Sequence, residues 1–403
     1  MQRYRQVLVL PQVRTSMLLM FFARLPMTAM GVTLTLHVVG SLGRGYGEAG
    51  LVGTATTVGS AVGAPVLGRL IDRYGLRPVI LTCGLASTTY WLSTPHLPYL
   101  VLVVVALPAG MLAVPAGSIA RQILTALVPE DQRRSAYALD TISLESSFMI
   151  GPAAGILAIT QFSSTVALTA VGCCYGLVAV ALFWMNPPIR NKNEITVSPG
   201  ARPPLRSWLT ARLSGILLVA LGAGFVLIGM ELAMLAALRE SDELDWAGVL
   251  FVVICLASLT GGLVHGAIRK SLPQLTLMVL LSALMLPVAL LDHPWWLLAL
   301  ALVPANLACA PTLASTSEAV SLSSPVRVRG EAMGLQDSAV RIGIGIGNPA
   351  VGFVIDHSSA AWGFAAAGGG GLLVAAVAGL LRRRKTGREA PALAEAVQSG
   401  QSA

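Results

Sequence analysis

Two ionisable residues lie within long apolar segments, where a charge is costly. Arg24 lies in residues 15–39 and Glu145 in residues 134–160. If both segments enter a membrane from the same face, each charge lies about 15 Å from that face, at about 1.5 Å of helix rise per residue. Because a charge near the bilayer centre costs about 3 kcal/mol or more unless it is paired or wet, we predict an Arg24–Glu145 ion pair. The pair either joins two helices or faces a cavity, where it binds a substrate charge or exchanges a proton.

The second half of the sequence has its own ionisable residues in apolar segments. Arg341 has the position there that Glu145 has in the first half, and Asp337 precedes it by one helical turn. Arg341 therefore either pairs with Asp337 or faces the cavity. Glu231 has no evident partner in its own segment, so it either lines the cavity or packs. Together with Arg24 and Glu145, these residues form the predicted substrate or proton pathway.

The elements that carry these charges are twelve apolar segments. Of the 403 residues, 55% are hydrophobic and 11% are charged, whereas about 25% are charged in soluble proteins. About 20 apolar residues in a helix are enough to cross a bilayer. The sequence thus predicts an all-α integral membrane protein with twelve transmembrane helices, at residues 15–39, 47–70, 78–95, 98–126, 134–160, 164–185, 210–238, 245–268, 273–291, 295–320, 330–356 and 361–381.

The basic residues are distributed unequally between the two sides of this arrangement. With both termini placed inside, only Arg44 and Arg239 of the 27 Lys and Arg residues fall in outer loops, and nearly all others fall in inner loops or tails. Because basic loops remain in the cytoplasm, we predict a multi-pass protein of the plasma (inner) membrane with cytoplasmic N- and C-termini. The formal net charge of +8 then reflects orientation, and no nucleic-acid partner is expected.

The two halves of the chain repeat each other. Arg-x-x-Ala-x-x-Leu occurs at 133–139 and again at 329–335, and Gly-Pro-x-x-Gly at 151–155 is matched by Asn-Pro-x-x-Gly at 348–352. An internal duplication of this kind predicts two pseudo-symmetric six-helix bundles with a linker between them and a tail. The predicted parts are a first bundle, 1–185, a cytoplasmic linker, 186–209, a second bundle, 210–381, and a disordered cytoplasmic tail, 382–403.

Two further groups of residues follow from this repeat. Arg121 and Glu318 are related by it, lie near the inner ends of their segments and are predicted to form a bridge at the inner face. Small residues and prolines in the repeated motif are expected to allow close helix packing. These residues are Gly151, Pro152, Gly155, Pro349 and Gly352.

One polar stretch between two apolar segments has specific residue types, at Gly68, Asp72, Arg73, Gly75 and Arg77. Gly75 allows a bend, and Asp72 can accept from backbone N–H groups or pair with Arg73 or Arg77. The stretch resembles the loop signature of the major facilitator superfamily, Gly-x-x-x-Asp-Arg-x-Gly-basic-basic, although a leucine replaces the first closing basic residue. The motif at 151–155 is similar in part to one in the fifth helix of the bacterial drug-efflux branch.

This resemblance implies a secondary transporter in which two bundles rock around a central site. It also implies that Asp72 lies near Gly330, where the N-terminus of the helix at 330–356 carries partial positive charge, and that their attraction holds the inner side closed. We expect a monomer in the lipid bilayer that exports a small amphipathic compound with protons as coupling ion. The alternatives are a proton-coupled uptake symporter or a facilitator, and a non-transport membrane enzyme or lipid-handling protein on the same fold.

Motifs for other chemistry are missing from the sequence. It has no nucleotide-binding loop, and its five cysteines and five histidines do not have metal-ligand spacing. We therefore expect no enzyme activity, no cofactor and no metal.

Overall fold

The computed structural model describes residues 2–190, 203–268 and 272–400, in which all regular structure is helical. Twelve segments correspond to the predicted spans. Ten helices of the described chain are long and apolar enough to cross a bilayer, and the shorter α4 and α13 with η4 complete the set. In chain order the segments are α2 (Pro11–Gly40), α3 (Tyr46–Tyr74), α4 (Leu76–Ser93), α5 (Tyr99–Met111) with α6 (Ala116–Leu127), α7 (Arg133–Gln161), α8 (Ser164–Met185), α11 (Ala211–Glu240), α12 (Ala247–Ala267), α13 (Gln274–Ala283) with η4 (Pro287–Leu290), α14 (Trp295–Ser323), α15 (Arg329–His357) and α16 (Ala360–Gly400).

Short helices lie outside these segments. Helix α1 (Gln2–Val9) precedes the first span, and α10 (Leu205–Trp208) precedes the seventh. The remaining connections contain 3-10 turns, which are η1 (Thr94–His96), η2 (Glu130–Gln132), η3 (Leu244–Trp246) and η5 (Val326–Val328).

Two spans that we predicted as continuous are interrupted. The span at 98–126 consists of α5 and α6, with a break at residues 112–115. Pro115 has no N–H to continue a helical ladder, and it disfavours a helical conformation at Val114. The span at 273–291 stops as α13 at Ala283 and resumes as η4 at Pro287, which suits the first position of a helical turn.

The last helix is longer than the sequence analysis predicted. Helix α16 extends to Gly400, whereas the last span was predicted to end at residue 381; residues 401–403 of the predicted tail lie outside the described residues. Residues 382–400 include several Ala, Arg and Glu, which are among the residues that most favour a helix.

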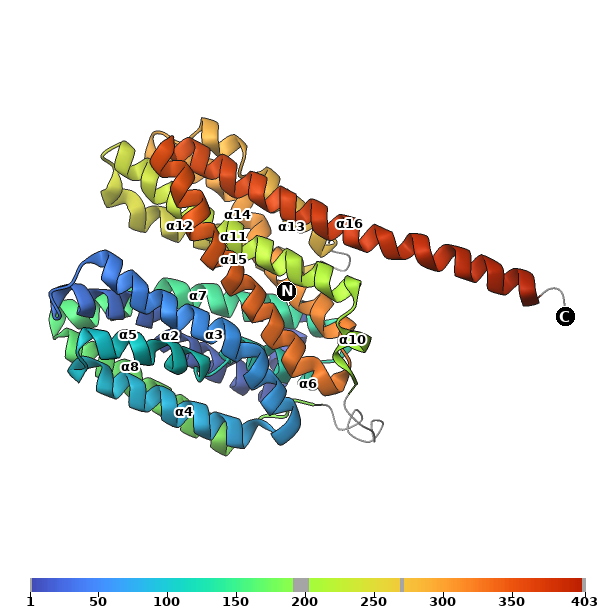
Figure 1. The fold of residues 1–403 in the computed structure, drawn as a ribbon, viewed down its shortest axis with the longest axis horizontal. Coiled ribbons are helices and arrows are strands. Elements are labelled where there is room, and N and C mark those ends of the chain that lie inside the picture. The colour runs from blue at the N-terminus through green and yellow to red at the C-terminus, as the bar shows by residue number, and fades with distance from the viewer. Residues whose placement is uncertain (1, 191–202, 269–271, 401–403) are drawn as a thin grey trace.

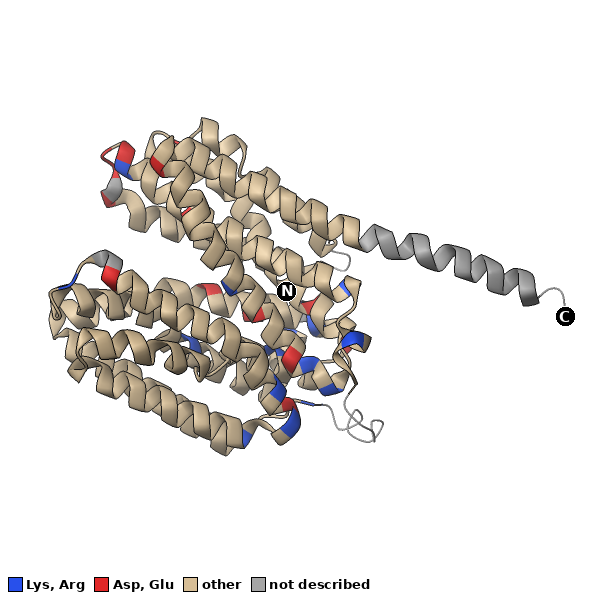
Figure 2. Ribbon diagram, viewed as in Figure 1, with Lys and Arg blue, Asp and Glu red and all other residues tan. Residues whose placement is uncertain are grey.

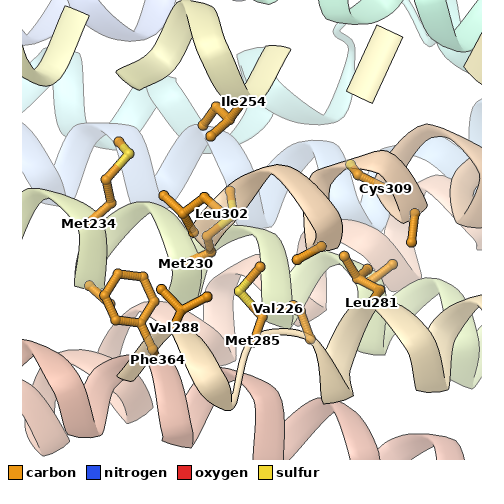
Figure 3. Packing of buried hydrophobic residues seen from close by; sticks show 14 of the residues in the cluster. Val226, Met230, Met234, Ile254, Leu281, Met285, Val288, Leu302, Cys309 and Phe364 are labelled. Carbon is orange, nitrogen blue, oxygen red and sulfur yellow. The ribbon is translucent and has the colours of Figure 1, made fainter. Parts of the chain in front are cut away.

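Each half of the molecule has its own apolar core. In the second half, Met230, Leu302 and Phe364 are buried together between α11, α14 and α16 (Figure 3). In the first half, Trp91 and Tyr175 stack with ring centroids 6.4 Å apart, and a second cluster lies nearer the other end. These clusters draw their residues from one half only, so the fold is an all-α membrane fold of two six-helix bundles.

The two bundles pack together at one end of the molecule and diverge toward the other (Figure 1). The packed end carries most of the basic residues of the described chain (Figure 2). There α3, α6 and α7 of the first bundle meet α12, α14 and α15 of the second, and we call this contact the inner seam. Gly68 allows the backbones to approach, because a Cβ at this position would lie 2.3 Å from the Gly330 carbonyl oxygen.

Candidate functional site

Arg24 of α2 is paired, but not with the residue that we predicted. Its guanidinium donates to the Asp140 carboxylate at 2.7 Å and to the Asp140 carbonyl at 3.1 Å, and its side chain is 2% exposed. Asp140 precedes Glu145 by five residues on α7, which is about 140° around a helix of 3.6 residues per turn. The face of α7 that meets α2 carries Asp140, Ser147 and Gly151. The predicted Arg24–Glu145 pair is therefore wrong, because the two side chains lie on different faces.

The packing motif of α7 lies against α2, as close helix packing requires. A Cβ added at Gly151 would lie 2.0 Å from Thr28 Oγ1, and one added at Gly155 would lie 2.8 Å from Thr33 Cγ2. Pro152 lies between them within the helix. Small residues here let the first and fifth spans approach, which supports the Arg24–Asp140 contact about three turns earlier on the same face of α7.

The matching motif of α15 does not pack in this way. A Cβ at Gly352 would meet nothing within 4 Å, and Pro349 is exposed. The close contacts of α15 with α11 come from another face of the helix, which carries Gly343, Gly347 and Val351; a Cβ at Gly343 would be 2.0 Å from the Leu221 carbonyl oxygen. The prediction of a packing role for Pro349 and Gly352 is wrong, because neither residue lies on the face that meets α11.

Glu145 faces the second bundle. The Cys309 thiol of α14 donates to the Glu145 carboxylate at 3.8 Å. Glu231 of α11 is partly buried beside Met230, whose sulfur accepts from Asn306. Neither glutamate forms an ion pair with a residue that the structure describes. Either one can therefore gain or lose a proton without breaking a salt bridge.

Two ion pairs cross the inner seam. Arg121 of α6 binds Asp337 of α15, and Arg134 of α7 binds Glu318 of α14 at 3.2 Å. The predicted Arg121–Glu318 bridge is therefore wrong, although both residues do bind across the seam. Arg121 binds Asp337 because α6 packs against α15, and Glu318 binds Arg134 because α14 packs against α7.

Arg341 does not pair with Asp337, the partner that the sequence analysis proposed for it. Asp337 is one turn away but is used by Arg121, so the Asp337–Arg341 pair is absent. Arg341 is partly exposed and makes no ion pair with a described residue. A guanidinium cannot lose its proton in a protein, so this position keeps a positive charge in the middle of α15.

Asp72 lies at the N-terminus of α15, at the predicted place. Its two carboxylate oxygens accept from the Gly330 N–H at 3.1 Å and the Glu331 N–H at 2.9 Å. A negative charge is stabilised there by the unpaired N–H groups and the helix dipole. The basic partner is Arg190, which donates to the Asp72 carbonyl at 2.6 Å and lies 3.8 Å from its carboxylate.

The other residues of the signature shape the turn itself. Gly75 has a φ of +83° and caps α3, a conformation that glycine adopts without strain. Arg77 donates to the Phe183 carbonyl at 3.1 Å and stacks on the Phe183 ring, and Arg73 stacks on Tyr74. Of the two pairings proposed for Asp72, with Arg73 or with Arg77, neither is formed, because both guanidinium groups lie over aromatic rings.

Helix α1, which the sequence analysis missed, also crosses the inner seam. The Tyr4 hydroxyl donates to the carbonyls of Gly262 and Leu263 in α12 at 3.1 Å and 2.5 Å. Burial raises the pKa of Tyr4 to about 12, so the hydroxyl stays protonated and remains a donor. The absence of a side chain at Gly266 makes room for it, since a Cβ there would lie 2.2 Å from the hydroxyl oxygen.

Two six-helix bundles with charged residues across their interface make up a polytopic membrane fold. The Major Facilitator Superfamily model matches residues 16–291 and 274–400, and the chain belongs to this family. None of the curated proteins compared matches the sequence.

Solved structures agree with this fold. The human organic anion transporter MFSD10 is 19% identical over 93% of this chain and 99% of its own, with a TM-score of 0.69. A bacterial homologue of the iron transporter ferroportin in an outward-facing state is 12% identical over 92% and 99%, with a TM-score of 0.73. The proton:xylose symporter XylE is 12% identical over 91% and 94%, with a TM-score of 0.70. At these identities the likeness concerns the fold alone.

Proposed function

We propose that the protein is a secondary active transporter that works by alternating access and couples the entry of protons to the export of a small amphipathic compound. The observation that carries this proposal is the inner seam. Its polar contacts, Asp72 with the start of α15, Arg121 with Asp337 and Arg134 with Glu318, all join one bundle to the other. Such contacts are lost when the bundles separate, so they stabilise one of two states.

We place the inner seam at the cytoplasmic face of the plasma membrane. Most basic residues lie at that end (Figure 2), and the positive-inside rule then puts both termini in the cytoplasm. The described arrangement is in that case closed to the inside, and the central region is reached from the outside. No contact in the described chain requires a second copy, so we propose that the monomer is the working unit.

Three ionisable residues are proposed for binding and coupling. Glu145 lies between the bundles, and a carboxyl group in a membrane interior binds a proton readily because its charged form is poorly solvated. Its contact with Cys309 joins α7 to α14, so protonation there acts on a junction between the bundles. Glu231 is the second candidate carrier. Arg341 keeps its charge and attracts an anionic or strongly polar group of the substrate.

The test uses purified protein in liposomes that contain a pH-sensitive dye. Amphipathic compounds are first screened by counterflow, and the accepted compounds are then tested for proton movement. We expect compound and protons to move in opposite directions. We also expect Glu145→Gln to keep counterflow and lose proton movement, whereas Glu130→Gln, which changes a carboxylate 77% exposed at the inner face, keeps both.

Other outcomes of the same assay would replace the proposal. Proton movement in the direction of the compound would indicate an uptake symporter, and counterflow without proton movement would indicate a facilitator. Absence of counterflow for every compound would favour the alternative of a membrane enzyme or a lipid-handling protein. Normal proton coupling in Glu145→Gln would remove Glu145 from the pathway.

A further inference from the structure

Helix α1 is joined to the first bundle by the chain, but it docks on the second. Leu10 is the single residue between the end of α1 at Val9 and the start of α2 at Pro11. The Tyr4 hydroxyl, in contrast, donates to two carbonyls of α12 in the second bundle. Helix α1 with Leu10, which we call the strap, therefore bridges the inner seam.

The connection between α1 and α2 is stiff. Leu10 has an extended conformation, with φ −70° and ψ 109°, and the following Pro11 disfavours a helical conformation at this residue. The Leu10 carbonyl accepts from the N–H groups of Val13 and Arg14, which fixes it to the first turn of α2. Because Leu10 cannot turn freely, α1 has to move with α2 when the bundles separate, and it cannot stay on α12.

The protein-facing side of α1 is buried between the two bundles. Val7 is fully buried in a cluster that contains Leu124 and Tyr137 of the first bundle and Ala314 of the second. Val9, on the other side of the helix, is 69% exposed. The buried side of the strap thus loses part of its apolar contacts, as well as its hydrogen bonds to α12, when the second bundle moves away.

We propose that α1 is an autoinhibitory strap, whose contacts with the second bundle hold the inner side closed and must break before a compound can enter from that side. These contacts exist in the closed state alone, so they stabilise it relative to the open state. This role rests on the two-state movement of the proposed function. In the export that we propose, compounds are loaded from the inner face, so the strap limits the fraction of the protein that is ready to load.

The experiment measures opening of the inner seam in the full-length protein through the labelling rate of Ser118→Cys with a thiol reagent. Ser118 is buried against the Gly330 carbonyl of α15, away from the strap, so its labelling reports opening of the whole seam. Cys83, buried in the core of the first bundle, remains as an internal control for unfolding. Mass spectrometry of the labelled peptides distinguishes the two thiols. The other accessible cysteines are replaced with alanine, namely Cys173, Cys174 and Cys255.

The first pair of variants is Val7→Ala and Val9→Ala. Both make the same substitution in the same helix, so they change its intrinsic helix propensity equally. Only Val7→Ala removes two buried methyl groups, and we expect it to raise the Ser118→Cys labelling rate up to about tenfold. Val9→Ala should leave the rate unchanged, and Cys83 should stay protected in both variants. Equal Ser118→Cys rates in the two variants, or labelling of Cys83 in step with them, would overturn the strap.

The second pair tests the stiffness of the connection. Pro11→Ala lets Leu10 turn while it leaves Tyr4 and Val7 in place, so α1 can stay on α12 as the bundles separate. We expect this variant to raise the Ser118→Cys rate, and adding Val7→Ala should raise it little further, because the contact no longer opposes opening. Pro78→Ala, in the first turn of α4, is the matched control and should not change the rate. Fully additive effects of Pro11→Ala and Val7→Ala would contradict the stiff connection on which the strap depends.

Asp337→Asn separates a failure of the strap from a failure of the proposed movement. This variant opens the seam by a different route, because it breaks the ion pair with Arg121. If Asp337→Asn raises the labelling rate and neither Val7→Ala nor Pro11→Ala does, the strap fails and the two-state movement stands. If no variant raises the rate, the two-state movement fails and the strap fails with it.

Discussion

Asp337→Asn is expected to open the inner seam, because it leaves the Arg121 guanidinium without its carboxylate. The Arg121 side chain is 10% exposed and that of Asp337 is 18% exposed. Removing one partner of a buried ion pair costs about 3–5 kcal/mol, and the partial exposure of this pair puts the cost near the lower end, about 3 kcal/mol. The cost applies only to the closed state, because Arg121 is hydrated once the bundles separate.

A change of about 3 kcal/mol moves a two-state equilibrium roughly 100-fold, at about 1.4 kcal/mol per tenfold. The reporter is Ser118→Cys, because the Ser118 hydroxyl is buried against the Gly330 carbonyl across the seam. Cys173, Cys174 and Cys255, which are exposed or partly exposed, are replaced with alanine. The labelling rate with a thiol reagent applied from the inner side then measures opening, and it should rise steeply in Asp337→Asn.

The double variant distinguishes an ion pair from two independent sites. Arg121→Gln with Asp337→Asn leaves no stranded charge, so its labelling rate should lie between wild type and Asp337→Asn. Glu130→Gln is the matched control, because Glu130 binds Arg133 within the first bundle and should not change the rate. Labelling of Asp337→Asn at the wild-type rate, or additive effects in the double variant, would refute the reasoning.

Three shorter predictions concern the other contacts. Asp72→Asn should keep membrane insertion but raise Ser118→Cys labelling about tenfold, because a neutral amide interacts weakly with the start of α15; an unchanged rate would contradict this role. Arg24→Ala should reduce the yield of folded protein more than the double change with Asp140→Asn, as measured by fluorescence-detected gel filtration, because the single change strands a buried carboxylate; equal yields would show that the pair adds no stability. Tyr4→Phe should lower the unfolding midpoint by a few degrees through the loss of the hydroxyl donor that the Gly262 and Leu263 carbonyls share, and an unchanged midpoint would show that α1 does not hold the seam.

The positions of the spans and of Asp72 could be predicted from the sequence for clear physical reasons. A membrane-spanning helix needs about 20 consecutive apolar residues, and such a run can be counted directly in the sequence. Asp72 lies in a tight turn at a helix end, where its surroundings depend on neighbouring residues and on the family arrangement. The breaks before Pro115 and Pro287 were missed because the residues there remain apolar. The helical backbone hydrogen bonds are interrupted at these positions, and composition does not show this.

The ion pairs could not be predicted, because they depend on how each helix is rotated about its axis. Glu145 and Asp140 lie on the same span, but only Asp140 faces α2. A signal was present in the spacing of Asp140, Ser147 and Gly151, which share one helical face and include the small residues that pack against α2. Contacts of residues from distant segments, such as Arg190 with Asp72 and Tyr4 with α12, have no such local signal.

Alternating access itself is tested most directly by measuring both ends of the molecule in the same preparation. One spin-label pair at the inner end uses Tyr74 and Leu322, and one at the opposite end uses Gly40 and Arg239, all exposed positions on different bundles. Pulsed electron–electron double resonance gives each distance distribution at several pH values and with an accepted compound. The account predicts two populations at each end that shift in opposite senses, so that the inner distance lengthens as the outer one shortens. Distances that stay fixed at both ends, or that lengthen together, would contradict it.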